Sequence, residues 1–435
     1  MINLKGKKLL VLGGGYATYD LVRLAKSEGV YTVVADYLTT GDAKEIADEA
    51  VLVSTTDMDS LLSLIDDKQI DGVFCGPSEF NLRNAMRLCD LAGLPFYCTP
   101  EQWDMCSDKV SFKKLCRKHG VPCIPEFHVT RDFLAEDLDK IVYPVMVKPV
   151  DGSSARGMTV CHNHDELKEA YDYALSFSVS KSVLVEKFIM IESGICPGYI
   201  VHDGELYIYR IHSRYMVDSE SDDGLFINFA LFPSERTTEY ISEFETSIKA
   251  MLKEINMNNG VLHVQGLIDK NDGNLYFHEM GLRLGGMFSS RILEPTTGIN
   301  DTRMMLRGAL GESIIDDEEI GKINLFLNGK VGGILCTPLK SGTIGTISGL
   351  DDIFTQYPKI NLLQYYKVGS TITKEKLGSL DQLFGRFYII SDDMRQLKEA
   401  INFIHSKLKI LDTSGNDMIF MRFDVNRIKD SFSGN

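Results

Sequence analysis

Two runs of alternating apolar residues carry the side chains best suited to chemistry in this chain. The runs and the turn between them are residues 261–269 (VLHVQGLID), 270–274 (KNDGN) and 275–286 (LYFHEMGLRLGG). The alternation predicts two β-strands, and NDG predicts a three-residue hairpin loop. Pairing the two ends of the turn places Gln265 opposite Glu279 on one face of the sheet. Two oxygen donors with Arg283 nearby would suit Mg²⁺ and a phosphoryl group in transfer. The alternative is an ordinary hairpin whose polar side faces water.

A lysine at the end of an apolar strand is the second feature. Residues 145–149 (VMVKP) carry Lys148, which is costly to bury unless it meets an anion, either a protein carboxylate or a bound phosphate. The segment that follows, residues 151–158 (DGSSARGM), is rich in glycine and serine, so its backbone N–H groups could face phosphate oxygens. Arg156 adds positive charge, but the GxxxxGK[ST] pattern of a Walker A loop is absent.

Charged side chains also occur in two later strands. Residues 182–189 (SVLVEKFI) place Glu186 in an apolar setting, and Glu192 follows soon after. These carboxylates could accept hydrogen bonds from adenine or ribose, or could be edge-strand charges that discourage sheet pairing.

A basic stripe is expected in residues 205–214 (ELYIYRIHSR). A period of two places Arg210, His212 and Arg214 on one face of that strand. Such a face could hold an acidic substrate or could simply be solvated, and both interpretations stay open.

The elements that must position these residues begin with a βαβ unit. The expected elements are a strand at 8–12 (KLLVL), a glycine turn at 13–15, a helix at 19–28, and strands at 31–35 (YTVVA) and 72–75 (GVFC). Asp36 follows the second strand, as in a nicotinamide-dinucleotide fingerprint, but Thr18 replaces the third glycine. A nicotinamide site is therefore weakly indicated, and the loop more often only makes the turn. Further on, Ser107 or Asp108 is expected to cap a helix over 110–120, next to Lys109.

Composition narrows the function classes. The 435 residues have 44% hydrophobic content and a net charge of −15, which disfavours a general nucleic-acid or anionic-membrane surface. Nine cysteines with no CxxC pair indicate reduced thiols and a cytoplasmic location. No signal-peptide pattern or membrane-spanning run is present.

The ordered set of signals from Asp108 to the glycine pair after Arg283 resembles the ATP-grasp ligase superfamily. The similar branch contains the carbamoyl phosphate synthetase large subunit, biotin carboxylase, the purine-pathway carboxylases and the L-amino acid ligases. The resemblance implies an α/β and α+β fold. Its expected parts are a doubly wound, Rossmann-like pre-ATP-grasp domain (1–107), a two-lobed ATP-grasp domain (108–311, with a lid subdomain at about 124–188) and a C-terminal α+β cap (325–435). In the cap, strands are expected at 331–336, 342–348, 387–390 and 419–423, and a helix at 393–409.

The resemblance also implies roles for individual residues. Nucleotide contacts are implied for Lys109, Lys148, Gly152, Ser153, Ser154, Gly157, Glu186, Lys187, Phe188 and Glu192. Gln265 and Glu279 match the Mg²⁺ ligands, and Arg283 with Lys148 would act on the transferred phosphoryl group. Acid-substrate contacts are expected at Arg210, Arg283, Ser289 and Arg291. Two positions depart from the family pattern: Gly281 stands where relatives have a metal-binding asparagine, and Met190 replaces the glycine before the ribose acid.

The activity implied is ligation in two steps. ATP, with Mg²⁺ or alternatively Mn²⁺, would phosphorylate a small carboxylate to an acyl phosphate, which an amine then attacks. The expected partners are these small molecules, with a homodimer also allowed. Two rival hypotheses are a non-catalytic ATP-binding relative, favoured by Gly281, and a nicotinamide oxidoreductase that uses the N-terminal glycine loop.

Overall fold

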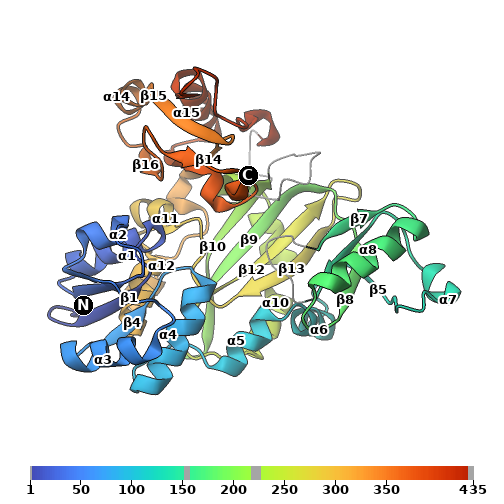
Figure 1. The fold of residues 1–435 in the computed structure, drawn as a ribbon, viewed down its shortest axis with the longest axis horizontal. Coiled ribbons are helices and arrows are strands. Elements are labelled where there is room, and N and C mark those ends of the chain that lie inside the picture. The colour runs from blue at the N-terminus through green and yellow to red at the C-terminus, as the bar shows by residue number, and fades with distance from the viewer. Residues whose placement is uncertain (1, 151–156, 217–226, 430–435) are drawn as a thin grey trace.

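Four β-sheets organise the part of the chain that the structure describes, and the largest of them has eight strands. The computed structural model describes residues 2–150, 157–216 and 227–429. In Figure 1 the long central strands separate an N-terminal unit from a small sheet at the opposite side, and a C-terminal unit lies above them. The mixed α/β and α+β class expected from the sequence is confirmed by this architecture.

The N-terminal unit is a parallel sheet with strand order β3-β2-β1-β4. Its strands are β1 (Lys8–Leu12), β2 (Tyr31–Ala35), β3 (Glu49–Val51) and β4 (Gly72–Phe74). Its helices are α1 (Tyr16–Ser27), α2 (Asp42–Ile46), α3 (Met58–Lys68) and α4 (Glu79–Ala92). The expected strands are found, but α1 begins three residues earlier than predicted, because Gly15 already serves as its N-cap.

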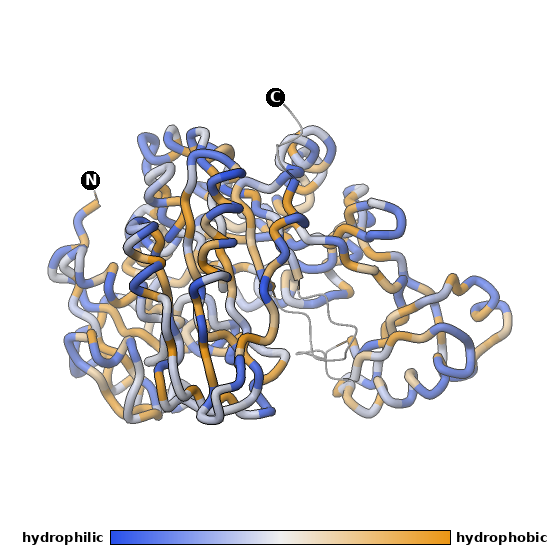
Figure 2. The backbone as a smooth tube through the Cα atoms, turned by 90° about the horizontal axis from the view of Figure 1, so that it is seen from above, coloured by the Kyte–Doolittle hydropathy of each residue, from blue (hydrophilic) through white to orange (hydrophobic). Residues whose placement is uncertain are grey.

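Two helices lead from this unit to the small sheet. They are α5 (Pro100–Ser107) and α6 (Lys109–His119), and the Asp108 side chain caps α6 by accepting a hydrogen bond from the Ser111 N–H. The small sheet has strand order β5-β8-β6-β7, with β5 (Glu126–Phe127), β6 (Val145–Pro149), β7 (Thr159–Cys161) and β8 (Val183–Lys187). Helices α7 (Ala135–Leu138) and α8 (His164–Phe177) belong to it, and α8 packs on β6 and β7. Figure 2 shows this part projecting to one side.

The eight-stranded sheet is antiparallel throughout, with order β13-β12-β9-β10-β11-β14-β18-β16. Its first five strands are β9 (Ile191–His202), β10 (Glu205–Met216), β11 (Ile227–Phe232), β12 (Gly260–Asp269) and β13 (Leu275–Gly281). Helices associated with this half are α9 (Thr237–Glu243), α10 (Glu245–Lys253), α11 (Ser290–Thr297), α12 (Asp301–Ala309) and α13 (Asp317–Ile320).

The C-terminal region contributes the other three strands of that sheet. Two of them lie where strands were expected, at 331–336 and 387–390, whereas the third strand and the joining of all three to the central sheet were not predicted. These strands are β14 (Val331–Pro338), β16 (Asn361–Gln364) and β18 (Leu383–Ser391). A separate small sheet joins β15 (Gly342–Ser348), β17 (Thr371–Ile372) and β19 (Lys409–Asp412), with α14 (Leu350–Gln356) and α15 (Met394–Lys407) nearby. The strand expected at 419–423 is absent from this described region: Ile419 forms only an isolated bridge with Leu339.

Within the described ranges, no helix is both long and apolar enough to cross a bilayer.

Candidate active site

The β12–β13 hairpin places Gln265 opposite Glu279, as predicted from the sequence. The predicted loop length is wrong, because the turn has four residues, 270–273. It is closed by the Asp269 N–H, which donates to the Asn274 carbonyl at 3.0 Å. A β-bulge corrects the resulting shift of one residue: Gly266 pairs with Phe277, Gln265 pairs with Glu279, and His278 is the extra residue. The predicted pairing of Gln265 with Glu279 therefore holds because the bulge at His278 offsets the one-residue error in the predicted turn length.

His263 fills the space beside Gly281, the position that departs from the family pattern. The two residues face each other across the hairpin. A Cβ atom on Gly281 would lie 2.9 Å from the His263 Cε1 and 3.1 Å from its Nε2. The ring is fixed by its Nδ1, which lies 3.1 Å from the carbonyl oxygen of Arg283, and its Nε2 lies 3.3 Å from the Gln265 amide nitrogen. Burial, reinforced by Arg283 and Arg210, holds the pKa of His263 well below its usual 6.5, so the imidazole is neutral.

A cavity of about 610 Å³ lies against this hairpin. Four of the residues proposed from the sequence line it: Lys109, Lys148, Glu279 and Arg283. They come from α6, β6, β13 and the segment after β13, so the fold brings together positions up to 174 residues apart in the chain. Of these, Glu279 makes no hydrogen bond or ion pair with any residue in the described ranges, which leaves its carboxylate available to a ligand.

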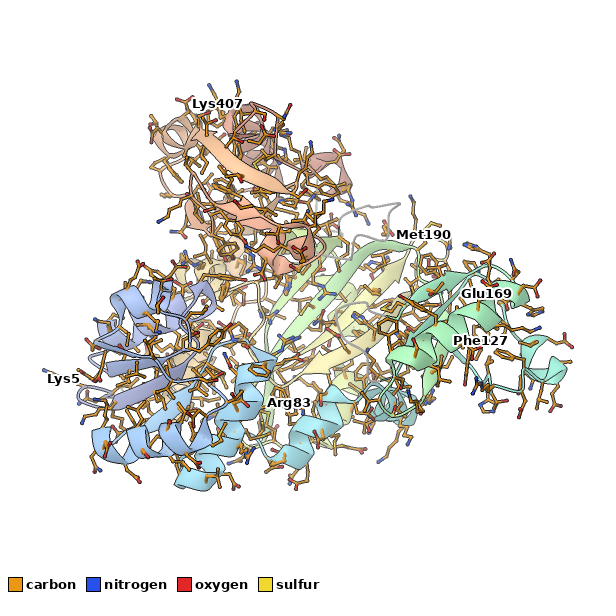
Figure 3. All side chains as sticks on the ribbon, in the orientation of Figure 1. Lys5, Arg83, Phe127, Glu169, Met190 and Lys407 are labelled. Atoms are coloured by element: carbon orange, nitrogen blue, oxygen red, sulfur yellow. The ribbon has the colours of Figure 1, made fainter. Side chains whose placement is uncertain are left out.

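Several further lining residues were missed by the sequence interpretation, among them Glu79, Arg83 and His263. Glu79 and Arg83 lie one helical turn apart on α4, and Figure 3 shows Arg83 where the N-terminal unit meets the central strands. Glu79 accepts a hydrogen bond from the Arg283 Nε at 2.8 Å. No local pattern marks these two residues. His263 could have been found, because it lies two residues before Gln265 on the same strand face.

Lys148 has the anionic partner that its apolar strand required. Its Nζ contacts one carboxylate oxygen of Glu186, and Lys113 Nζ binds the other at 2.6 Å. Glu186 and Lys113 are both only 3% exposed, whereas Lys148 also lines the cavity. Burial alone would raise the pKa of Glu186, but Lys148 and Lys113 outweigh it and hold that pKa below the usual 4.5. Glu186 is thus a buried anchor for two lysines.

The other residues proposed for nucleotide binding lie outside the set that lines this cavity. Lys187 forms ion pairs with Asp269 at 2.7 Å and Asp272 at 2.6 Å, which tie the small sheet to the hairpin. The Phe188 N–H donates to the Pro144 carbonyl, and Glu192 is an exposed residue of β9. Gly157 packs against Phe177. Gly152, Ser153 and Ser154, with Arg156, lie outside the described residues.

The predicted basic stripe on β10 is deeply buried. Arg210 is 2% exposed, His212 3% and Arg214 8%. The guanidinium of Arg210 is close to two glycines, because a Cβ on Gly198 would lie 2.9 Å from it and one on Gly285 would lie 3.2 Å away. The solvated-face interpretation of this stripe is therefore wrong.

A chain of hydrogen bonds holds Arg210. Its Nε donates to the Tyr209 hydroxyl at 2.9 Å, and that hydroxyl donates to Asp301 at 2.8 Å. The Ser289 hydroxyl donates to the same Asp301 oxygen at 3.0 Å. Two of the four proposed substrate residues, Arg210 and Ser289, are thus connected through Asp301.

Arg291 lies apart from the cavity-lining residues and has its own partners. Its guanidinium forms two hydrogen bonds with the Asp20 carboxylate, at 2.6 and 2.7 Å, and also contacts Asn361. It stacks at 5.2 Å over the ring of Tyr388. Since Asp20 belongs to α1 and Asn361 to β16, Arg291 joins the N-terminal and C-terminal parts of the molecule.

The N-terminal glycine loop is closed by the protein itself. The Asp36 carboxylate accepts hydrogen bonds from the N–H groups of Gly14 and Leu38, each at 2.8 Å. A Cβ on Gly14 would lie 2.7 Å from the Lys44 side chain, which therefore covers the loop. In a dinucleotide site the loop would receive pyrophosphate and the acid would bind ribose. Here the same groups satisfy one another, which argues against the nicotinamide hypothesis.

The hairpin fits a hard cation held mainly by oxygen atoms. In the described part of the chain, no group of three His, Cys, Asp or Glu side chains forms a metal site. A cation beside Glu279 would therefore need the Gln265 amide, phosphate oxygens and water, a donor set that Mg²⁺ accepts.

Comparison with known proteins agrees with this geometry. Residues 108–316 match the family model "Carbamoyl-phosphate synthase L chain, ATP binding domain". The 2-oxoglutarate carboxylase small subunit of Hydrogenobacter thermophilus is 26% identical over 351 residues, which cover 73% of this chain and 70% of that protein. The D-alanine–D-alanine ligase of Acetivibrio thermocellus is 27% identical over 244 residues, covering 50% of this chain and 61% of that ligase.

Solved structures of two enzymes share the fold over nearly the whole chain. The phosphoribosylglycinamide synthetase from Anaerococcus prevotii superposes with a TM-score of 0.72 at 20% identity, covering 94% of this chain and 100% of that one. The L-amino acid ligase from Bacillus licheniformis gives a TM-score of 0.73 at 19% identity, with coverages of 94% and 99%. Residues 108–316 therefore form an ATP-binding domain of the ATP-grasp type, and the chain as a whole is similar to ATP-dependent ligases of the ATP-grasp superfamily.

Proposed function

We propose that this protein uses ATP and Mg²⁺ to activate a small carboxylate as an acyl phosphate and joins it to an amine, releasing ADP and phosphate. The observation that carries the proposal is the convergence of Lys109, Lys148, Glu279 and Arg283 on one cavity. Two lysines, a carboxylate and an arginine are the groups required to bind and neutralise a transferring phosphoryl group.

The nucleotide end of the site is assigned to the two lysines. Lys109 and Lys148 would bind ATP phosphates, and Glu186 would keep Lys148 in position from behind. The segment from Glu186 to Phe188 is proposed to border the adenine. Closing the site over the phosphates would exclude water and limit wasteful hydrolysis.

The metal end is assigned to Gln265 and Glu279, which face each other on the hairpin. Mg²⁺ held there would neutralise charge on the phosphates during transfer. A neutral amide is a weaker ligand than a carboxylate, so phosphate oxygens and water must complete the coordination.

The acid-binding end is assigned to arginines. The guanidinium groups of Arg210 and Arg283 both lie near His263, since both help to hold its pKa low. Arg214 is buried beside them, and its Nε has no partner among the described residues. A carboxylate would be attracted by this concentration of positive charge. Ser289 supports Arg210 through Asp301, whereas Arg291 is held by Asp20 apart from the cavity-lining residues.

The direct test is phosphate release from ATP in the presence of Mg²⁺, with amino acids and other small carboxylates supplied singly and in pairs. Release that requires one particular pair and yields ADP would establish the ligase and identify its substrates. Removing Mg²⁺ with a chelator should abolish release. Arg283→Ala should do the same without unfolding the protein, because its side chain bonds only to Glu79 and the Leu284 carbonyl in the described structure.

A second candidate function is ATP binding without turnover, favoured by Gly281 at the usual asparagine position. ATP binding that is detectable by calorimetry, with no release for any pair in the panel, would support this alternative and contradict the proposed ligase.

A further inference from the structure

Gly281 and His263 form a matched pair at the metal end of the site. Gly281 lacks the side chain that a metal-binding residue would need, and the His263 ring occupies the volume that such a side chain would enter. The two residues are direct cross-strand partners, so they share one face of the hairpin with Gln265 and Glu279. The polar side chain that is missing at position 281 is thus matched by a polar side chain, His263, that occupies the same space.

The nitrogen that faces this volume is the His263 Nε2. It lies 3.1 Å from where a Cβ of residue 281 would be, and an asparagine oxygen lies two bonds beyond its own Cβ. The other nitrogen, Nδ1, is 3.1 Å from the Arg283 carbonyl oxygen and must carry the proton to bond it. Nε2 therefore carries the lone pair, which is the form of imidazole that binds metals.

The carbonyl contact also resembles the support that histidine ligands receive in metal sites. Such ligands usually donate their second N–H to a carbonyl or carboxylate, which fixes the ring and its tautomer. His263 is 2% exposed and lines the same cavity as Glu279. Its Nε2 accepts a hydrogen bond from the Gln265 amide nitrogen at 3.3 Å, and a metal ion would take the place of this bond, with the amide turned so that its oxygen faces the ion. Its position, tautomer and neighbours all fit a ligand.

We propose that His263 Nε2 replaces the missing side chain at position 281 as a metal ligand, giving a site of one imidazole, one amide and one carboxylate. This inference rests on the proposed function for the metal itself. It adds a consequence for metal choice, because an imidazole favours Mn²⁺ over Mg²⁺ relative to an all-oxygen donor set.

The test uses Mn²⁺ with ADP as the probe on the full-length chain. Electron spin-echo spectroscopy of bound Mn²⁺ should show coupling to an imidazole ¹⁴N nucleus. Labelling the protein with ¹⁵N-histidine should remove that ¹⁴N signal, which separates histidine from adenine and amide nitrogens. His263→Gln should abolish the coupling and weaken Mn²⁺ binding roughly tenfold or more. The variant's Mg²⁺ affinity should change much less, since Mg²⁺ prefers oxygen donors.

His278→Gln is the matched control. His278 lies on the same hairpin, as the extra residue of the bulge, and is half-buried; desolvation of its ring and nearby Arg214 and Lys148 hold its pKa well below 6.5, so it is also a neutral imidazole. The nitrogen coupling should persist in this variant.

A double variant makes the test independent of how well His263→Gln folds. His263→Ala with Gly281→Asn vacates the ring volume and restores an amide at position 281. It should bind Mn²⁺ without histidine coupling and shift metal preference toward Mg²⁺.

Three outcomes would count against the proposal in different ways. Bound Mn²⁺ without a histidine signal in the wild type would overturn it while leaving the proposed ligase intact. A signal lost in His278→Gln but kept in His263→Gln would show that His278 is the ligand in place of His263, and would also overturn the proposal. Failure of the wild type to bind ATP or Mn²⁺ at all would overturn both this inference and the proposed function.

Discussion

The N-terminal glycine loop and the β12–β13 hairpin both combine glycines with an acidic residue, yet they differ in what those groups contact. In the loop, the Asp36 carboxylate is bonded to two backbone N–H groups and Lys44 packs over Gly14. In the hairpin, Glu279 faces a cavity and has no hydrogen-bonding partner within the described residues. Buried polar groups are normally satisfied, so a carboxylate left to face a cavity indicates a ligand.

The glycines differ in the same way. Gly14 gives its space to a lysine that closes the loop, whereas Gly281 gives its space to a histidine that remains in the cavity wall. The side chain that fills the space beside a glycine therefore decides whether the segment is closed by the protein itself or stays open to a ligand. The predictions below test this contrast, beginning with the largest expected effect.

Glu279→Gln should reduce turnover by about a hundredfold to a thousandfold, because it removes a charge that the proposed metal requires during phosphoryl transfer. The free energy of unfolding should change by less than about 0.5 kcal/mol, as for other substitutions that break no contact. Phosphate release and urea unfolding measure the two quantities. Near-normal turnover would contradict the proposed role of Glu279 and leave no functional difference between the hairpin and the N-terminal glycine loop.

Lys148→Met should abolish turnover and also destabilise the fold, which distinguishes it from Glu279→Gln. The variant leaves Glu186, 3% exposed, with Lys113 as its main partner, so unfolding should become easier by about 1–3 kcal/mol. Urea unfolding gives this number. Adding Glu186→Gln should recover part of the stability but none of the activity; full recovery of activity would exclude a role for Lys148 in binding phosphate.

The pH dependence of stability should report the same buried cluster. Because Lys148 and Lys113 hold the folded-state pKa of Glu186 below 4.5, its carboxylate stabilises the fold above that pH. The stabilisation should be lost as pH falls from about 4.5 through the lower folded-state value. The difference in unfolding free energy between wild type and Glu186→Gln should therefore shrink between pH 5 and pH 3.5 in urea titrations. A difference that stays constant over this range would contradict the assignment.

Asp36→Ala should have the smallest effect on activity. It removes two hydrogen bonds to backbone N–H groups and should cost about 1–2 kcal/mol of unfolding free energy. ATP turnover should stay within about twofold of the wild type, since such a change lies far from the groups that contact phosphate. Calorimetry should detect no NAD(P) binding to either protein. A loss of NAD(P) affinity in the variant would reverse the comparison and favour the oxidoreductase hypothesis.

Much of the local structure followed from the sequence. The alternation around Gln265 and Glu279, the cap at Asp108 and the partly buried lysine at 148 were all readable because each depends on neighbours along the chain. The loop length was wrong because a bulge cannot be recognised without its partner strand. Two of the three strands that the C-terminal region adds to the central sheet were expected, at 331–336 and 387–390, but their pairing with that sheet was not, since sheet pairing joins residues that are distant in sequence.

Within the site, long-range contacts account for what remained hidden. Glu79 and Arg283 are 204 residues apart and meet only in the folded chain, and Arg291 proved to be bonded to Asp20, 271 residues away. The assignments of Gln265, Glu279, Lys109 and Lys148 remain proposals about ligands, but three of these four residues now line a common cavity.

The sequence by itself determined which segments become strands and helices and which of them carry lysines, carboxylates and arginines, because periodicity and capping act over a few residues. Only the tertiary structure decided which of those charges are satisfied by the protein and which face a cavity. Asp36 and Glu279 look equally eligible in the sequence, and the difference between them arises from packing: Asp36 meets backbone N–H groups of its own loop, whereas Glu279 lies on a sheet face whose neighbouring units stand far enough apart to admit a ligand.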